Sequence, residues 1–139
     1  MRLVRLIYTS SLKTDTDHAE VNKIHAVSQE NNTKNNITGM LFFGGRKFLH
    51  TIEGGRENVN LLYNKICRDP RHEHVLLLSY GEISEREFDK FSMKLILLTK
   101  SSNKITLRYS IGEAFNPYEM SGDTALRMML AMRDSNTNA

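Results

Sequence analysis

The sequence predicts an α+β fold in which helices pack against a sheet. Short apolar, strand-prone segments alternate with longer segments whose apolar residues recur every three or four positions. Between residues 38 and 53, two strand-like segments flank a glycine pair, which is the pattern of a β-hairpin. At 139 residues, with 40% hydrophobic and 25% charged residues, the chain is long enough for one domain with its own core.

The first half of the chain predicts a strand, a helix and the hairpin. We expect the helix to begin near Asp17, because Asp17 and Glu20 have the spacing of a capping box. The polar run at residues 31–36 should end it. One apolar stripe of this helix should face the sheet. That stripe consists of Val21, Ile24 and Val27, and the strands of this half are residues 3–8, 38–43 and 47–53.

The second half predicts another helix and further strands. Residues 56–68 have the clearest helical periodicity, and the helix should stop at Asp69 because a residue before proline disfavours helix. Residues 75–79 are apolar without alternation, which predicts a strand buried on both faces. We expect a charged connection at residues 81–90 with a short helix near Glu85. Further extended segments are expected at residues 91–98 and 105–111.

The predicted order of strand, helix, strand, strand, helix and strand is that of the ferredoxin-like sandwich, here with one additional strand. In that arrangement we expect the first and third strands to be parallel neighbours in the middle of the sheet, with both helices on one face. Alternation along the third strand puts Phe48, His50 and Ile52 on one side. Tyr8, at the end of the first strand, should then approach His50 beneath the helices. A hydrogen-bonded core histidine is the simpler explanation of His50.

A C-terminal helix is expected at residues 121–134, with Ser121 as its cap. Its apolar residues cover most of its circumference, so it needs a wide apolar surface. We expect it to pack across the open face of the sheet and to contribute to self-association; a helix that only caps the core is the alternative. The chain therefore divides into a domain at residues 1–99 and a helical extension at residues 100–139.

Composition argues against several classes of protein. No stretch approaches the ~20 apolar residues of a membrane span, and the N-terminus lacks the pattern of a secretion signal. One cysteine, Cys67, suits a reducing cytoplasm. A net charge of +3, with basic residues scattered among acidic ones, argues against nucleic-acid binding. Cys67, His72 and His74 are too few for a structural zinc site, and no phosphate-binding or hydrolase motif is present.

Several polar residues should converge at one end of the first two helices. Each has an ordinary explanation, but their convergence indicates a ligand site. A flat heteroaromatic ligand would suit it, since Ile24 and Ile66, one from each helix, would close on its two faces. The polar residues are Tyr8, Asn32, His50, Lys65, Asp69, Arg71 and His72.

The sequence resembles the BLUF domain family of blue-light sensors, which bind a flavin, usually FAD. The matching segments occur in the family's order between residues 2 and 98. They are RLIYTS at 5–10, NN at 31–32, ITGML at 37–41, FL at 48–49, IEG at 52–54, DPRH at 69–72 and SM at 92–93.

The resemblance implies that the flavin ring lies between the two helices, sandwiched by Ile24 and Ile66. It also implies that Asn32 binds the N3/O4 edge of the ring. Lys65, Asp69 and Arg71 would lie near its O2, ribityl or phosphate parts. The residues assigned to cofactor binding are Tyr8, Ile24, Asn31, Asn32, His50, Lys65, Ile66, Asp69, Arg71 and His72, and those assigned to photochemistry are Tyr8, His50 and Met93.

His50 departs from the family pattern, which has glutamine at this position. In the family the glutamine bridges the tyrosine hydroxyl and the flavin N5/O4 edge. After light-driven electron and proton transfer from the tyrosine, the amide tautomerises or reorients, and a new hydrogen bond to O4 shifts the absorption to the red. An imidazole has one donor and one acceptor on opposite sides of a rigid ring, so it cannot reproduce this exchange. Because unperturbed imidazole titrates near pH ~6.5, we also expect a pH-dependent dark spectrum.

We therefore expect a short, stand-alone, cytoplasmic flavoprotein that regulates through protein–protein contacts and is not an enzyme. FAD is favoured over FMN, and His50 should impair or alter the photocycle. We expect a homo-oligomer with an unidentified downstream protein partner, and no nucleic acid or membrane. Two alternatives stay open: a flavin-free interaction module of the same fold, and a small flavin-dependent redox sensor or enzyme.

Overall fold

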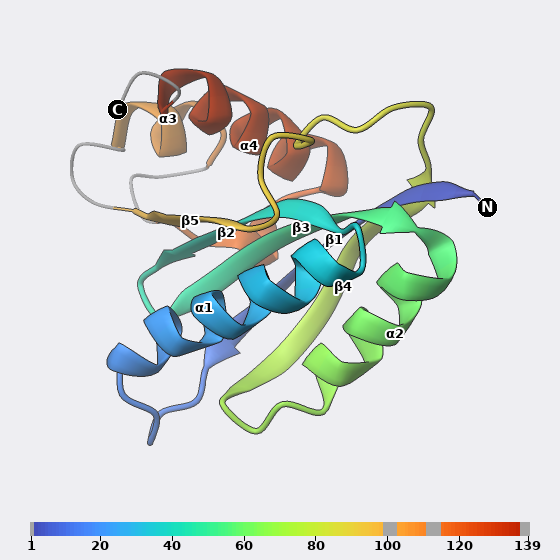
Figure 1. Cartoon of the computed structure of the whole chain (residues 1–139). Coiled ribbons are helices and arrows are strands. Elements are labelled where there is room, and N and C mark those ends of the chain that lie inside the picture. The colour runs from blue at the N-terminus through green and yellow to red at the C-terminus, as the bar shows by residue number, and fades with distance from the viewer. Residues whose placement is uncertain (1, 99–102, 111–114, 137–139) are drawn as a thin grey trace.

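The computed structural model describes residues 2–98, 103–110 and 115–136. Figure 1 shows three layers: α1 and α2 lie on one face of a sheet, and α4 lies on the other. The strands are β1 (Leu3–Leu12), β2 (Thr38–Gly44), β3 (Lys47–Gly55), β4 (His72–Glu82) and β5 (Lys94–Leu97). The helices are α1 (Ala19–Lys34), α2 (Arg56–Cys67), α3 (Asn103–Arg108), the short 3-10 helix η2 (Pro117–Glu119) and α4 (Gly122–Asn136).

The sheet has the strand order β4-β1-β3-β2-β5, so β1 and β3 occupy its middle. The elements β1 to β4 form the predicted ferredoxin-like sandwich, and β5 is the additional strand, parallel to β2. The predicted hairpin joins β2 and β3. Its turn residues Gly45 and Arg46 have φ angles of 56° and 62°, the left-handed pair that a type I′ turn requires. This turn suits the right-handed twist of the strands.

The expectation that β1 and β3 run parallel is wrong. They pair antiparallel, with Leu6 opposite Ile52 and Tyr8 opposite His50. Helix α1 returns the chain across the sheet, so that β1 and β2 run in the same direction. The hairpin then reverses the chain, and β3 fits between β1 and β2 in the opposite direction.

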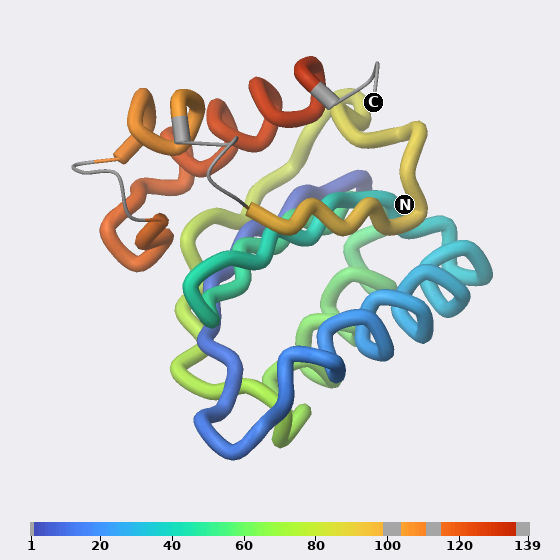
Figure 2. The backbone as a smooth tube through the Cα atoms, turned by 90° about the vertical axis from the view of Figure 1, so that its left-hand side faces the viewer, coloured from blue at the N-terminus to red at the C-terminus, as the bar shows by residue number. Residues whose placement is uncertain are grey.

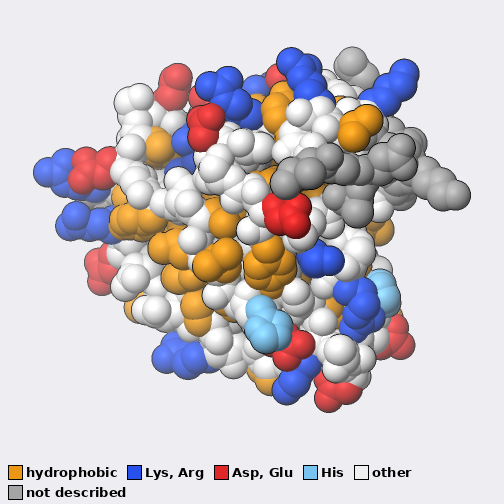
Figure 3. All heavy atoms as spheres, turned by 180° about the vertical axis from the view of Figure 1, so that it is seen from behind, with side chains coloured by type: hydrophobic (Ala, Val, Ile, Leu, Met, Phe, Trp, Pro, Cys, Tyr) orange, Lys and Arg blue, Asp and Glu red, His pale blue; other side chains and the backbone are white. Residues whose placement is uncertain are grey.

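Strand β4 is an edge strand and is not buried on both faces as we expected. It pairs with β1 alone, and Leu76 and Leu77 are 45% and 47% exposed. An apolar run without alternation also occurs in a half-covered edge strand, so the pattern was ambiguous. In Figure 2, β4 (yellow-green) and β5 (orange) lie at opposite edges of the sheet. Figure 3 shows hydrophobic side chains gathered on the rear face, where β4 is the outermost strand.

Helix α1 begins at Ala19, two residues after Asp17, whose Oδ1 accepts the Ala19 N–H at 3.0 Å. It continues through the polar run that we expected to end it, so Asn32 is a buried helical residue. Val27 does not face the sheet; it is 57% exposed.

The segment from residue 83 to residue 93 forms bends and a turn, and the short helix expected near Glu85 does not form. The carboxylate of Glu53, which is fully buried, accepts the N–H groups of Glu87 and Phe88 at 2.8–3.1 Å. These amides therefore have partners without a helix.

Residues 105–108 belong to helix α3 and are not extended as we expected; Ile111 lies outside the described residues. Ile105 and Tyr109, four residues apart, both pack against the core that α4 helps to form. Tertiary packing explains why a helix is preferred here over an extended segment.

Helix α4 packs across the open face of the sheet, as predicted. Ser121 Oγ accepts the Thr124 N–H at 3.1 Å, which confirms the cap. Three methionines are buried against sheet residues of the same core cluster. They are Met128, Met129 and Met132, and the sheet residues include Ile7, Phe42 and Leu49. The helix and the sheet therefore share one core.

No helix formed by residues 2–98, 103–110 or 115–136 has the length and apolar character needed to cross a bilayer.

Candidate functional site

The centre of the site is a pair of side chains on the two middle strands. Tyr8 and His50 are direct partners in the register of β1 and β3, so they lie on the same face of the sheet. Their neighbours place that face under α1 and α2. The hydroxyl of Tyr8 lies 2.9 Å from Nδ1 of His50, and both residues are nearly inaccessible to solvent. The predicted approach of these two residues is confirmed.

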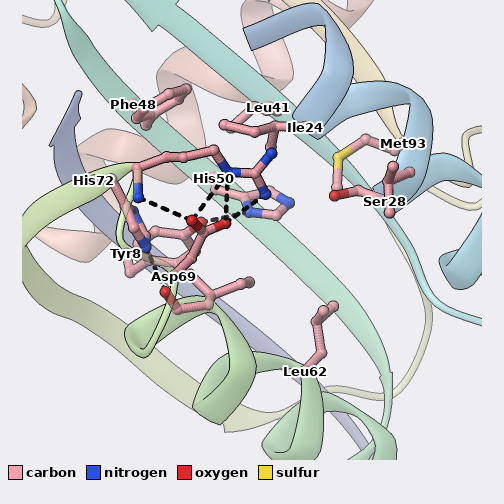
Figure 4. Close-up of a pocket in the computed structure, with 13 residues that line it drawn as sticks. Tyr8, Ile24, Ser28, Leu41, Phe48, His50, Leu62, Asp69, His72 and Met93 are labelled. Carbon is pink, nitrogen blue, oxygen red and sulfur yellow. Dashed lines mark hydrogen bonds and ion pairs between the residues drawn. The ribbon is translucent and has the colours of Figure 1, made fainter. Parts of the chain in front are cut away.

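Tyr8 and His50 line a cavity of about 80 Å³, which Figure 4 shows with its lining side chains. Ile24 of α1 and Ile66 of α2 line it from the two helices. The other predicted site residues around it are Asp69, Arg71, His72 and Met93.

A groove of about 680 Å³ runs between α1 and α2 beside this cavity. Ile66 and Asp69 line both spaces, so the two together form one slot between the helices. The groove contains the remaining predicted residues, which are Asn31, Asn32 and Lys65. A flat ring with a long polar tail suits this shape better than a compact ligand does.

Five further residues line the cavity that we did not assign to the site. They are Val27, Ser28, Leu41, Phe48 and Leu62. Helical spacing could have identified Ser28 and Leu62, which lie one turn from Ile24 and Ile66 respectively. Leu41 could have been found from the hairpin register, because it pairs with His50.

His72 has no ring nitrogen left for a ligand. Its Nε2 donates to the carbonyl oxygen of Ile66, and its Nδ1 lies 2.9 Å from Ser10 Oγ. Because a carbonyl can only accept, Nε2 carries the hydrogen and a neutral His72 accepts from the Ser10 hydroxyl. His72 thus offers the cavity its ring surface only.

Asp69 and Arg71 form an ion pair at the cavity. Arg71 Nη2 lies 2.6 Å from Asp69 Oδ2, and Arg71 Nη1 lies 3.9 Å from Glu20 of α1. Burial alone would raise the pKa of Asp69, but the hydrogen bonds from Arg71 outweigh it and the pKa is lowered. The Arg71 side chain therefore extends from the end of α2 towards α1 as a fixed positive charge.

The segment before β5 is attached to α1 by two side chains. Asn32 Nδ2 donates to the carbonyl of Ser92 at 3.0 Å, and His25 Nε2 donates to that of Met93 at 2.8 Å. These bonds hold Met93 at the cavity wall. We did not assign His25 to the site, because nothing in its local sequence distinguishes it from a solvated helix residue.

Burial keeps both members of the central pair neutral. It lowers the pKa of His50 to about 3, with a further contribution from His72. We therefore no longer expect the pH-dependent dark spectrum that an unperturbed imidazole would give near neutral pH. Burial also raises the pKa of Tyr8 well above its usual range, and Cys67, Tyr63 and Asp69 raise it further. Tyr8 therefore keeps its proton.

One polar atom in the site has no partner among the described residues. His50 Nε2 is buried and makes no hydrogen bond. A buried polar atom of this kind is costly unless a ligand satisfies it. The slot therefore combines this atom with apolar walls at Ile24 and Ile66 and with the positive charges of Arg71 and Lys65. A flavin, with an apolar ring, polar ring edges and a phosphorylated tail, fits this set of residues.

The sequence matches a family profile described as BLUF, sensors of blue-light using FAD, over residues 3–94. The chain belongs to the BLUF family.

Two solved BLUF structures cover almost the whole chain. The photo-activated state of BlsA has a TM-score of 0.84 and 26% identity, and each chain is covered to 91%. The dark state of BlrB has a TM-score of 0.81 and 27% identity, and each chain is covered to 96%. These likenesses confirm the family and its fold.

A longer relative is the blue light- and temperature-regulated antirepressor BluF of Escherichia coli K12. It is 27% identical over 121 residues, which are 87% of this chain. The chain spans only 30% of the length of that antirepressor.

Proposed function

We propose that this BLUF protein binds one flavin in the slot between α1 and α2 and acts as a blue-light-responsive regulator. BLUF domains bind FAD or FMN, and we favour FAD for this chain. The observation that carries the proposal is the Tyr8–His50 pair, joined at 2.9 Å, with the second nitrogen of His50 unpaired at the cavity. A simple core histidine would have no reason to leave that nitrogen without a partner.

The residues that would hold the flavin come from both helices. Ile24 and Ile66 would pack on the two faces of the ring, and Asn32 would bind its polar edge. Lys65 and Arg71 would offset the charge of the phosphates. We favour FAD because the matched family profile is described by its use of FAD.

A bound flavin would supply the absorption of blue light and an acceptor for one electron and one proton. The chain's own residues determine where the phenol hydrogen points and which hydrogen bonds can change. Tyr8 is the buried donor, because it keeps its phenol hydrogen and directs it to His50. His50 remains neutral, so it can relay a hydrogen bond without adding charge. We propose that His50 impairs or alters the photocycle, because its ring cannot adopt the two hydrogen-bond arrangements that a glutamine amide can.

We propose an output through protein contacts rather than through catalysis. Residues 1–99 would bind the flavin, and the extension at residues 100–139 would present a surface to a downstream partner in the cytoplasm. Arg133 of α4 donates to the carbonyl of Glu87 at 2.7 Å, and the amide of Glu87 donates to Glu53 of β3. The central strands and α4 thus contact the same segment. A homo-oligomer is part of this proposal.

The test is to purify the protein with added FAD and FMN and to remove unbound flavin. We expect a visible flavin band, one flavin per chain, and FAD as the cofactor released on denaturation. A supplemented protein with no visible band would contradict the proposal and favour a flavin-free interaction module. Turnover of NAD(P)H with a dye acceptor would favour an enzyme instead.

A further inference from the structure

The direction of the hydrogen bond between Tyr8 and His50 can be derived from their surroundings. Tyr8 is 4% exposed, and its other neighbours are the rings of Tyr63 and His72, with centroids 5.7 and 6.5 Å away. Both nitrogens of His72 are already bonded, to Ser10 and Ile66. His50 Nδ1 is thus the acceptor that the described residues offer to the Tyr8 phenol.

The opposite direction would leave a hydrogen without a partner. If Nδ1 of His50 donated to the Tyr8 oxygen, the phenol hydrogen would be buried with no acceptor. Tyr8 therefore donates and Nδ1 accepts. A neutral imidazole carries one hydrogen, so in His50 it lies on Nε2. The unpaired atom of this cavity-lining residue is then an N–H group.

We propose that His50 is a fixed hydrogen-bond donor to the ligand of the cavity and that it selects a ligand presenting a bare acceptor atom there. This inference rests on the proposed function and specifies which form of the flavin the site prefers. An oxidised flavin ring presents N5 as a bare acceptor, whereas reduction adds a hydrogen there and leaves the two carbonyl oxygens unchanged. We place the His50 donor against N5, so the site favours the oxidised ring.

Two features prevent His50 from presenting an acceptor to the cavity in place of this donor. Moving the hydrogen to Nδ1 would break the bond from Tyr8 and leave the phenol unpaired. Phe48 and Ile52 flank His50 on the same face of β3, and both are buried, which limits rotation of the ring. A glutamine could turn its amide and present either a donor or an acceptor. His50 can present only the donor.

The first experiment measures the tautomer directly, by NMR of protein labelled with ¹⁵N-histidine at pH 7. The His50 signal is assigned by its loss in His50→Gln, and His74→Gln, at an exposed position, is the matched control. We expect the hydrogen on Nε2 in both the flavin-free and the flavin-loaded protein. A hydrogen on Nδ1, a charged ring or a mixture of tautomers would overturn the proposal.

Tyr8→Phe tests whether Tyr8 positions the tautomer. Without the phenol, no hydrogen bond fixes the tautomer, so the flavin-free variant should show both tautomers in exchange. An unchanged Nε2 tautomer would contradict the role assigned to Tyr8. This measurement requires no flavin.

The second experiment compares the reduction potential of bound flavin in the protein and in His50→Gln. We expect the histidine protein to favour the oxidised form by about tenfold more, which for a two-electron couple is a midpoint potential lower by about 30 mV. An equal or higher potential would overturn the selection of the oxidised ring. If neither protein bound flavin, the proposed function would fail, whereas the tautomer result would stand on its own.

Discussion

The hydroxyl of Tyr8 lies 2.9 Å from Nδ1 of His50, between the two central strands of the sheet. The distance results from their direct pairing in the antiparallel register. Because both are buried, the contact joins two neutral groups in a medium of low polarity, where a hydrogen bond is stronger than in water. The central strands of the sheet therefore hold this hydrogen bond of the site in a fixed position.

The first prediction concerns the pH dependence of stability. At pH 7 His50 is neutral in both the folded and the unfolded state. As the pH falls below ~6.5, the unfolded chain binds a proton that the folded chain does not bind until about pH 3. The free energy of unfolding should therefore decrease, by up to about 1.4 kcal/mol per pH unit.

Urea unfolding of the protein and of His50→Gln between pH 7 and 4 measures this effect. The glutamine variant should lose less stability over that range, because it lacks the titrating group. Equal losses of stability in the two proteins would show that burial does not lower the pKa of His50.

The low pKa of His50 also bears on the spectrum. Because His50 stays neutral, the dark spectrum of the flavin-loaded protein should not change between pH 5 and 8.

The second prediction concerns Asn32, which is buried and donates to the carbonyl of Ser92. Asn32→Ala leaves that carbonyl and the polar flavin edge without a partner, so flavin affinity should fall by about 1–3 kcal/mol. Isothermal titration with FAD measures the loss. Asn22→Ala is the matched control on the same helix, since Asn22 is exposed and lies outside the slot, and it should bind flavin normally. Equal flavin affinities in the two variants would show that Asn32 does not contribute to flavin binding.

The third prediction concerns helix α4. Met128 is fully buried between the helix and the sheet, so Met128→Ala should reduce the free energy of unfolding by about 2–5 kcal/mol. Arg127→Ala, at an exposed neighbour, should leave the free energy of unfolding nearly unchanged.

Removal of residues 121–139 is a stronger test, because it exposes the apolar face of the sheet that includes Phe42 and Leu49. The truncated protein should aggregate or change its oligomeric state in light scattering. A truncated protein with unchanged mass and unchanged melting temperature would contradict the role of α4 in the core.

Much of the fold could be predicted because its strongest signals are local. The glycine turn of the hairpin, the periodicity of α2 and the Ser121 cap of α4 each depend on a few consecutive residues. The direction of β3 relative to β1 depends instead on how the whole chain crosses the sheet, and local patterns do not contain it. The exposure of β4 likewise depends on which strand lies at the edge.

The candidate site shows the same division. Tyr8, His50 and the isoleucines of the two helices could be placed at one cavity from strand alternation and helical spacing. The pKa of His50 could not, because it results from burial by residues distant in sequence. His25 was missed for the same reason: its role is a bond to the carbonyl of Met93, 68 residues away.

The last prediction decides how the protein responds to light. If flavin binds as proposed, Tyr8 remains available as the electron donor, so illumination should quench the excited flavin or produce short-lived radicals. A persistent red shift needs a side chain with two stable hydrogen-bond arrangements, and His50 has one. We therefore expect no long-lived red-shifted form in the protein itself and the appearance of one in His50→Gln.

Absorption spectra recorded in the dark, during blue illumination and during recovery measure this red shift, with His74→Gln as the control. A reversible red shift in the unmodified protein that outlasts illumination by seconds would show that an imidazole can replace the amide. The inference that His50 has a single stable hydrogen-bond arrangement would then be wrong.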